Sequence, residues 1–454
     1  MQDKTYVPFT EAMKQSHTIL VPNMLPNHFK LIISVFRTYG YHMELLEDDG
    51  PEIAEAGLKY THNDACYPAI LVIGQFMHAL ESGKYDPDKT AVIMFQTGGG
   101  CRASNYISLI RKALERGGMT QVPVISFSFA GLEKHPGFKL TLPLLHGLLY
   151  AVLYGDLMMA LKHQVEPYEN HPGDAAALAD RWTARLAKEL GAGGKIRHRD
   201  ILNNYRQMIA DFGAIPQTKR DAVKVGIVGE IFVKYSPLAN NGLEKFLVSE
   251  GAEVVVPGLV DFLLYCVWNN VLDTRLYGRK WAAYPWVQLA FRFLCRRREE
   301  ISALLKEDGR FAPWTPFTEV MLMAEGYISE GVKMGEGWLL TAEMLELAHS
   351  GCKNIVCAQP FGCLPNHICG KGMMKPIKER NPDVNIVAID YDPGASRVNQ
   401  ENRLRLMLAN AGETGVGGRG AFGGVRERAE NAAEVRTLSG YAGRSGKARG
   451  KLPV

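Results

Sequence analysis

The sequence predicts an α/β protein with two doubly wound, Rossmann-like parallel-sheet domains, helical insertions and a disordered C-terminal tail. Three observations predict this fold class. Short β-branched or apolar runs alternate with segments of helical period, this alternation begins again near residue 223, and the residues after 410 are rich in glycine and arginine and almost free of large apolar side chains. Such a tail cannot bury enough apolar surface to fold on its own.

The strands and helices fall into two series. In the first, the expected strands are 17–21, 41–46, 90–95 and 122–127, and the expected helices are 26–39, 68–82 and 104–116. In the second, the expected strands are 223–228, 253–256, 354–358 and 384–390, and the expected helices are 238–250, 338–350, 371–380 and 396–408. Two further stretches, 140–213 and 260–305, have helical character throughout.

We therefore expect four parts along the chain. Residues 1–135 form a first α/β domain with Cys66 and Cys101, and residues 136–220 form a helical region. Residues 221–410 form a second α/β domain with a helical insertion and Cys363, and residues 411–454 form a flexible tail. No repeat of roughly 20 to 50 residues is visible, which argues against solenoids and propellers.

The distribution of charge argues against a nucleic-acid-binding protein. Residues 412–454 contain eight basic and four acidic residues, so the tail alone accounts for the net charge of +4. The remaining body is neutral, whereas nucleic-acid binding depends on clustered Lys and Arg side chains that neutralise phosphates.

The sequence also lacks the signals of export. The N-terminal residues have neither the apolar core of a signal peptide nor an Arg-rich amphipathic presequence. The most apolar stretch, 140–155, is shorter than the roughly 20 residues needed to span a bilayer and contains Pro143 and His146. We therefore expect a buried helix at this stretch, a cytoplasmic protein and no membrane partner.

Three of the eight cysteines share one local pattern. Cys101, in TGGGCR, follows an expected strand and precedes a helix, and Cys363, in PFGCLP, has the same place in the second series. Cys66 lies in a polar turn with Pro68 opening the next helix. In parallel α/β sheets ligands bind at the carboxyl ends of the strands, and a helix N-terminus favours a thiolate. These three cysteines are therefore candidate metal or cluster ligands.

The other cysteines have simpler interpretations. Four lie in apolar helical runs or beside a strand and are expected in the core: Cys266, Cys295, Cys352 and Cys357. Cys369 follows Cys363 by six residues and could be an additional ligand, a neighbour of a cluster or a packed thiol.

The spacing of the three thiols favours an iron–sulfur cluster over zinc. Zinc sites usually contain close pairs such as C-x2-C, which none of the three positions forms, whereas thiolates from distant loops can each bind a different iron of a cluster. Three ligands on a four-iron cluster leave one iron open, which is a catalytic arrangement. No phosphate-loop or G-x-G-x-x-G motif is present. Polar residues in the same loops could bind cluster sulfurs or substrate: His62, Asp64, Arg102, Asn366 and His367.

At these residues the sequence resembles a known family. The segments that carry the resemblance are NDACYPA, TGGGCR, GIVGEIFVKYSPLANNGLEKFL, CAQPFGCLPNHICGKG and NIVAIDYDPGAS. They are similar to the 2-hydroxyacyl-CoA dehydratase and benzoyl-CoA reductase superfamily, most of all to its activase-related branch. The resemblance covers about residues 6–410.

The resemblance implies a cytoplasmic, anaerobic enzyme component that holds a 4Fe-4S cluster through Cys66, Cys101 and Cys363. An ATP-hydrolysing activator would supply one low-potential electron, which is passed to an acyl-CoA thioester in a radical dehydratase (a lyase) or a reductase (an oxidoreductase). Because this chain has no phosphate-loop motif, the activator is expected to be a separate chain. The catalytic residues are unknown, with Arg102, His62 and His367 as candidates. A homodimer, or a heterodimer with a related subunit, is also expected.

Two other functions compete with this one. The first is a non-catalytic iron–sulfur protein for electron transfer or cluster holding within a larger complex, which would require four-cysteine ligation, with Cys369 as the fourth ligand. The second is a nucleic-acid protein that acts through its arginine-containing tail, which the neutral body disfavours.

Overall fold

The computed structural model describes residues 6–62, 64–95, 101–127, 133, 135–193, 197–278 and 281–414. The described residues up to Leu408 form one compact unit. The predicted tail, from residue 415 onward, lies outside the described residues.

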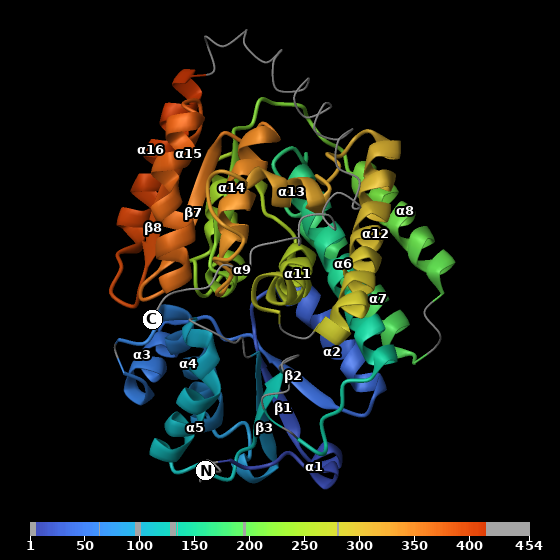
Figure 1. Cartoon of the computed structure of the whole chain (residues 1–454), viewed down its shortest axis with the longest axis vertical. Helices are drawn as coiled ribbons and strands as arrows, with labels where there is room; N and C mark the ends of the chain where they lie inside the picture. Colours follow the sequence, from blue (N-terminus) through green and yellow to red (C-terminus); the bar gives the residue numbers. More distant parts are fainter. Residues whose placement is uncertain are drawn as a thin grey trace, which may run out of the picture. The chain divides into compact units, whose positions relative to one another are not determined.

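The first sheet has four parallel strands in the order β2-β1-β3-β4 (Figure 1). These strands are β1 (Thr18–Pro22), β2 (His42–Leu46), β3 (Thr90–Phe95) and β4 (Val124–Phe127). Ile19 of β1 is paired with Met43 on one side and with Ala91 on the other. All four strands were expected within two residues of these bounds.

The second sheet repeats this arrangement with the order β6-β5-β7-β8. Its parallel strands are β5 (Lys224–Gly229), β6 (Glu253–Val255), β7 (Asn354–Pro360) and β8 (Asn385–Tyr391). In both sheets the strand order reverses between the first and third strands in sequence, and ligands bind in parallel α/β sheets at the carboxyl ends of such strands. The predicted α/β class with two parallel sheets is therefore confirmed.

The helices around the first sheet pack very closely in one place. They are α1 (Glu11–Ser16), α2 (Pro26–Thr38), α3 (Pro51–Tyr60), α4 (Tyr67–Glu81) and α5 (Tyr106–Arg116). A Cβ on Gly74 of α4 would lie 2.0 Å from the carbonyl oxygen of Ile53, so only glycine allows α3 and α4 to approach this closely. Helix α3 was missed in the sequence, because it is short and Gly57 interrupts its helical pattern.

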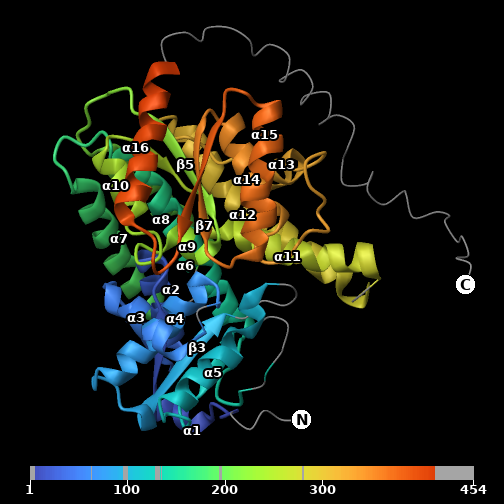
Figure 2. The ribbon, with the colours of Figure 1, turned by 90° about the vertical axis from the view of Figure 1, so that its left-hand side faces the viewer.

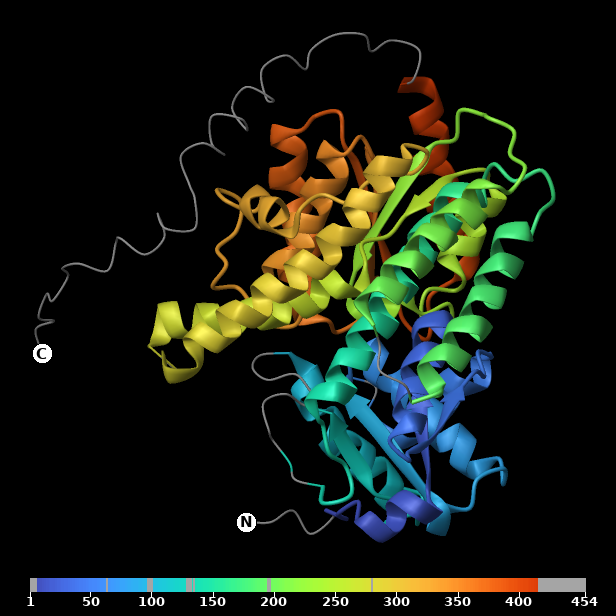
Figure 3. The ribbon, with the colours of Figure 1, turned by 90° about the vertical axis from the view of Figure 1, so that its right-hand side faces the viewer.

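The stretch from 140 to 213 is helical, as expected, and forms α6 (Leu142–Val165), α7 (Asp174–Gly191) and α8 (His198–Gly213) (Figure 3). By length and composition α6 could cross a membrane, but 78% of its most apolar window is buried inside the protein. Leu153 and Leu157 of α6 are fully buried in the largest apolar cluster, which also contains Ile19 and Val225 from the two sheets. Helix α6 is therefore a core helix.

The second half adds more helices. Its helical insertion consists of α11 (Leu259–Tyr277), α12 (Tyr284–Asp308) and α13 (Phe317–Met323), and the sheet is flanked by α9 (Ile231–Tyr235), α10 (Leu243–Ser249), α14 (Trp338–His349), α15 (Met374–Arg380) and α16 (Arg397–Thr414) (Figures 1 and 2). Helix α10 starts later than expected because Asn241 and Gly242 have positive φ angles, 55° and 71°. Helix α16 continues to Thr414, so the first residues assigned to the tail are helical.

Candidate functional site

Cys66 lies where the two halves of the unit touch. It is the N-cap of α4, is 5% exposed, and its Sγ is 3.3 Å from the hydroxyl of Tyr106. The next residue, Tyr67, donates its backbone N–H to the carbonyl oxygen of Phe361, which lies just after β7, at 3.0 Å. The start of α4 is therefore held against the loop that carries Cys363.

Cys101 lies in the loop beyond β3. It is half-buried and is the N-cap of a short 3-10 turn, Arg102–Asn105, that leads into α5, and its Sγ accepts a hydrogen bond from the backbone N–H of Ala103 at 3.4 Å. The glycines of TGGG precede it at residues 98–100, which lie outside the described residues.

Cys363 follows β7 in a tight turn and is 6% exposed. The turn needs Gly362, whose φ is +70°, and a Cβ on this glycine would lie 3.2 Å from the Cα of Cys66. After Cys363 the chain enters a π-helical turn, Asn366–Gly370. The glycine before Cys363 thus permits both the turn and the approach to Cys66.

The structure brings the three predicted ligands together. Cys66 contacts the Gly362 turn, and the sulfur of Cys101 lies beside the same loop, because a Cβ on Gly335 would be 2.8 Å from Pro365 Cγ and 3.7 Å from Cys101 Sγ. The thiol of Cys101 interacts electrostatically with that of Cys66, and the thiol of Cys363 with that of Cys101. Three loops that are far apart in sequence therefore place their thiols in one region, where the carboxyl ends of β3 and β7 meet.

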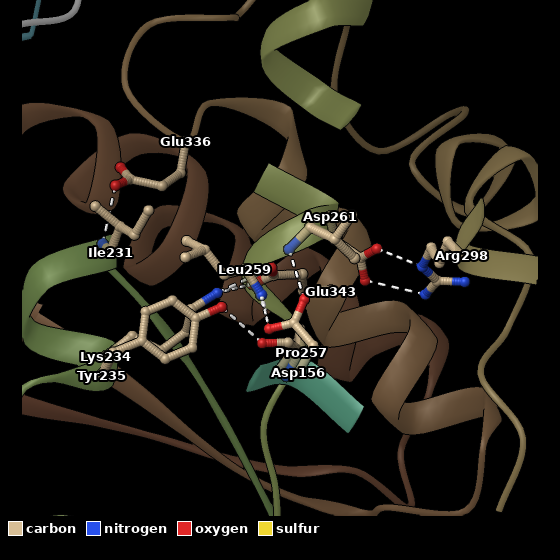
Figure 4. Close-up of polar contacts among 11 residues, drawn as sticks. Asp156, Ile231, Lys234, Tyr235, Pro257, Leu259, Asp261, Arg298, Glu336 and Glu343 are labelled. Atoms are coloured by element: carbon tan, nitrogen blue, oxygen red, sulfur yellow. Dashed lines mark hydrogen bonds and ion pairs between the residues drawn. The ribbon is translucent and has the colours of Figure 1, made fainter. Parts of the chain in front are cut away.

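Two carboxyl groups that sequence reasoning missed lie in the same region. Glu230 directly follows β5 and accepts a hydrogen bond from the N–H of Val233 at 2.9 Å. Glu336 accepts one from the N–H of Ile231, also at 2.9 Å (Figure 4). Burial, followed by the charge of Glu336, raises the pKa of Glu230 to about 8, and burial also raises the pKa of Glu336. For Glu230 the sequence does contain a signal, because an acidic residue stands immediately after an apolar strand.

Burial and these two carboxyl groups raise the pKa values of the three thiols. Burial raises the pKa of Cys66 and raises that of Cys101 to about 12, with Glu336 as the next cause for Cys101. The pKa of Cys363 is also raised, by burial and then by Glu336 and Glu230. Without a metal the three thiols are therefore protonated at neutral pH, which argues against a simple thiolate nucleophile.

The candidate donors of the site are the three thiols. Across the described parts of residues 6–414, no three histidine, cysteine, aspartate or glutamate side chains lie close enough to hold one metal ion. A cluster does not need that geometry, because each thiolate binds a different iron. Binding to a metal also removes the thiol proton, which offsets the raised pKa values.

The predicted polar residues divide into two groups. Arg102 bonds the carbonyl oxygen of Asp64 and lies 3.5 Å from the position of a Cβ on Gly362, so it borders the thiols. His62 forms an exposed pair with Asp64 at 3.3 Å.

The residues after Cys363 mainly fix their own loop. The Nδ1 of His367 is 2.7 Å from the carbonyl oxygen of Cys363, and Asn366 is fully buried and donates to the carbonyl oxygen of Ala358. Cys369 is 1% exposed, and burial followed by Glu336 raises its pKa to about 11. None of the three thiols is among the groups that shift the pKa of Cys369.

Cys266 lies closer to the site than expected. Its pKa is raised to about 12 by burial and then by Glu336, the same carboxyl that acts on Cys101 and Cys363. Cys266 was expected in the core, but it is only half-buried and packs at the margin of an apolar cluster. The apolar helical run around it contains no information on which loop packs against that helix.

Beneath Glu336 lies a set of buried ion pairs (Figure 4). The Nζ of Lys234 is 3.0 and 3.3 Å from the two carboxylate oxygens of Glu343, and Arg298 pairs with Asp261 at 2.5 and 3.0 Å. Asp156 of α6 accepts the N–H groups of Leu259 and Val260, each at 2.8 Å. These contacts join α9 to α14, α12 to α11 and α6 to the start of α11, and we call this set of contacts the floor of the site.

A scan against models of protein families finds no match, and a search of curated proteins finds none.

Proposed function

We propose that this protein is the iron–sulfur component of a system of the 2-hydroxyacyl-CoA dehydratase and benzoyl-CoA reductase type. In this proposal Cys66, Cys101 and Cys363 hold a 4Fe-4S cluster, a separate ATP-hydrolysing activator supplies electrons, and an acyl-CoA thioester is the substrate. The observation that carries the proposal is the convergence of the three cysteine loops at the carboxyl ends of β3 and β7. The reaction type, and with it a cytoplasmic, anaerobic and dimeric enzyme, is proposed from the family resemblance of the motifs quoted above.

The residues around the thiols suit this role. A bound cluster would accept and pass on single electrons at low potential. The Tyr106 hydroxyl lies next to the sulfur of Cys66 and can hydrogen-bond the thiolate, while burial keeps the pKa of Tyr106 well above its usual value. With a pKa of about 8, Glu230 is mostly protonated at neutral pH and adds little negative charge beside three thiolates.

Arg102 gives the site its positive charge. Its guanidinium lies between the Cys66 loop and Gly362 and acts to lower the pKa of Cys66. A cation at this place could bind an anionic part of a thioester substrate, so Arg102 is the strongest of the three candidate catalytic residues in this proposal.

Anaerobic reconstitution tests the proposal. We expect wild-type protein to take up iron and sulfide, and we expect the Cys101→Ser and Cys363→Ser variants to lose most of this uptake. Cys352→Ser is the matched control, because Cys352 is 2% exposed in the core behind the second sheet. Cys266 is a poorer control, since its thiol interacts with Glu336. Colourless, iron-free wild-type protein would contradict the proposal.

Electron paramagnetic resonance distinguishes an open from a closed cluster. A cluster with three protein ligands should change its spectrum when an acyl-CoA thioester is added, whereas a four-cysteine cluster for electron transfer should not.

A further inference from the structure

A second pocket, of about 220 Å³, lies at the carboxyl ends of β1 and β2. Asn23 directly follows β1, and residues 47–49 directly follow β2. A further wall comes from the second half of the protein, from residues 236–238 after α9. Ligands of parallel α/β sheets bind at this end of the strands. No cysteine is among the described residues that line the pocket, so it is separate from the thiol site.

The pocket is acidic. Glu47, Asp48 and Asp49 line it, and none of the described lining residues is a lysine, arginine or histidine. Glu47 pairs with Lys30 at 3.1 Å, whereas the side chains of Asp48 and Asp49 have no hydrogen bond or ion pair with any described residue. They do not cap α3 either, because its N-cap is Gly50 and has no side-chain cap. Two uncompensated carboxylates exclude an anionic ligand and favour a cation.

Two side-chain amides at this pocket lack partners. Gln75 of α4 lines the pocket and is 2% exposed, and its Oε1 is buried without a hydrogen bond from any described residue. The Oδ1 of Asn23 is also buried without a partner in the described part of the chain. An unpaired buried polar group is costly, and most such groups bind another protein group, a water or an ion. The two amides therefore indicate a polar occupant.

A hydrated divalent cation matches the chemistry and the size of the pocket. Mg²⁺ is bound by carboxylate and carbonyl oxygens, and it usually takes one or two carboxylates from the protein and keeps several waters. The pocket has room for about seven waters at roughly 30 Å³ each. Across the described residues no three acidic side chains converge on one ion, so waters must complete the coordination shell.

We propose that this pocket binds a hydrated Mg²⁺ ion, which is held by Asp48, Asp49 and the oxygens of the two unpartnered amides, directly or through its waters. The ion joins the loops after β1 and β2 to residues 236–238. Helix α9 runs between these residues and Glu230, which directly precedes it, so the ion and the thiol site contact opposite ends of one short helix. This inference does not depend on the proposed reaction.

The probe is Mn²⁺, because it accepts the ligands of Mg²⁺ and has an electron paramagnetic resonance signal. We expect the full-length, iron-free protein to bind one Mn²⁺ with a Kd below about 1 mM and to release it when Mg²⁺ is added. Asp48→Asn/Asp49→Asn should weaken this binding at least about tenfold. Glu55→Gln is the matched control, because Glu55 is exposed on α3 and does not line the pocket.

A second variant tests the role of Gln75. Gln75→Leu removes a buried amide that has no partner, so the metal-free variant should be at least as stable as wild type in urea. Mg²⁺ should raise the urea midpoint of wild type and should raise that of Gln75→Leu by clearly less, because the variant has lost a group that holds the ion or its waters.

Four results would overturn the proposal. They are no Mn²⁺ binding up to about 5 mM, Mn²⁺ affinity in the double aspartate variant equal to that of wild type or of the Glu55→Gln control, equal stabilisation of wild type and Gln75→Leu by Mg²⁺, and stronger stabilisation by putrescine than by Mg²⁺. The last result would assign the pocket to an organic amine.

Discussion

Replacing Lys234 by Met would test whether the buried pair with Glu343 supports the floor of the site. The two side chains are 3% and 2% exposed, and the ammonium contacts both carboxylate oxygens. In Lys234→Met, Glu343 loses its cation in a buried site and must be protonated in the folded state. At pH 7, protonating a carboxyl with an unfolded pKa near 4.3 costs about 3.7 kcal/mol, at about 1.4 kcal/mol per pH unit. This agrees with the roughly 3–5 kcal/mol lost when one partner of a buried pair is removed.

The pH dependence gives this prediction its signature. The pKa of Glu343 in the folded variant is raised above its unfolded value, so stability falls as pH rises from the unfolded pKa toward the folded one. The same calculation at pH 5 gives a cost of only about 1 kcal/mol. Urea unfolding of metal-free protein at both pH values measures the difference.

Two variants serve as controls for the buried pair. In Lys234→Met/Glu343→Leu no charge is left unpaired, so most of the lost stability should return. Lys30 and Glu47 form an exposed pair at 3.1 Å, and Lys30→Met should cost at most about 1 kcal/mol at either pH. The reasoning is refuted if Lys234→Met unfolds at the wild-type urea concentration at pH 7, or if its deficit is the same at pH 5.

Three further predictions concern the site and its floor. Gly362→Ala and Gly351→Ala should each lose about 1–2 kcal/mol of stability, because both glycines have a positive φ. Only Gly362→Ala should also lower iron uptake, because its Cβ would contact Cys66. Equal iron uptake by the two variants would contradict this. Asp156→Ala leaves two buried N–H groups without an acceptor and should cost at least about 2 kcal/mol in urea unfolding, and a loss below about 1 kcal/mol would count against the network. Because Glu230 has a folded pKa of about 8, the free energy of unfolding of the wild-type protein falls as pH rises from about 4.5 to 8. Glu230→Gln should therefore gain at least about 1 kcal/mol relative to wild type between pH 5 and pH 8. Urea midpoints of the two proteins that change in parallel with pH would refute this.

Local patterns predicted the strands well, and long-range packing explains what was missed. Each of the eight strands is a run of apolar residues that can be recognised without knowing what packs against it, and all eight were predicted. The position of Cys101 and of Cys363 just beyond the carboxyl end of a strand followed from the local pattern, but the two strands belong to different sheets, and no local rule brings their loops together. By contrast, Glu336 lies far from any strand in sequence and reaches the site only because Gly335 fits against Pro365. Helix α3 depends on its contact with α4 and has too weak a pattern of its own.

The repeated topology explains the positions of the three thiols and of Glu336. Within each half, one helix leads into the third strand: α4 precedes β3, and α14 precedes β7. Cys66 is the N-cap of α4, and Glu336 lies one residue before the N-cap of α14, so the two residues hold nearly corresponding positions.

Cys101 and Cys363 form the second corresponding pair, since each lies in the loop after the third strand of its half. The two halves share one topology, and four corresponding positions therefore lie in a common region. The fourth position is Glu336, which holds a carboxyl group where a thiol would complete a four-cysteine site. This arrangement supports ligation by three cysteines over the four-cysteine alternative, because Cys369 has no counterpart among the corresponding positions.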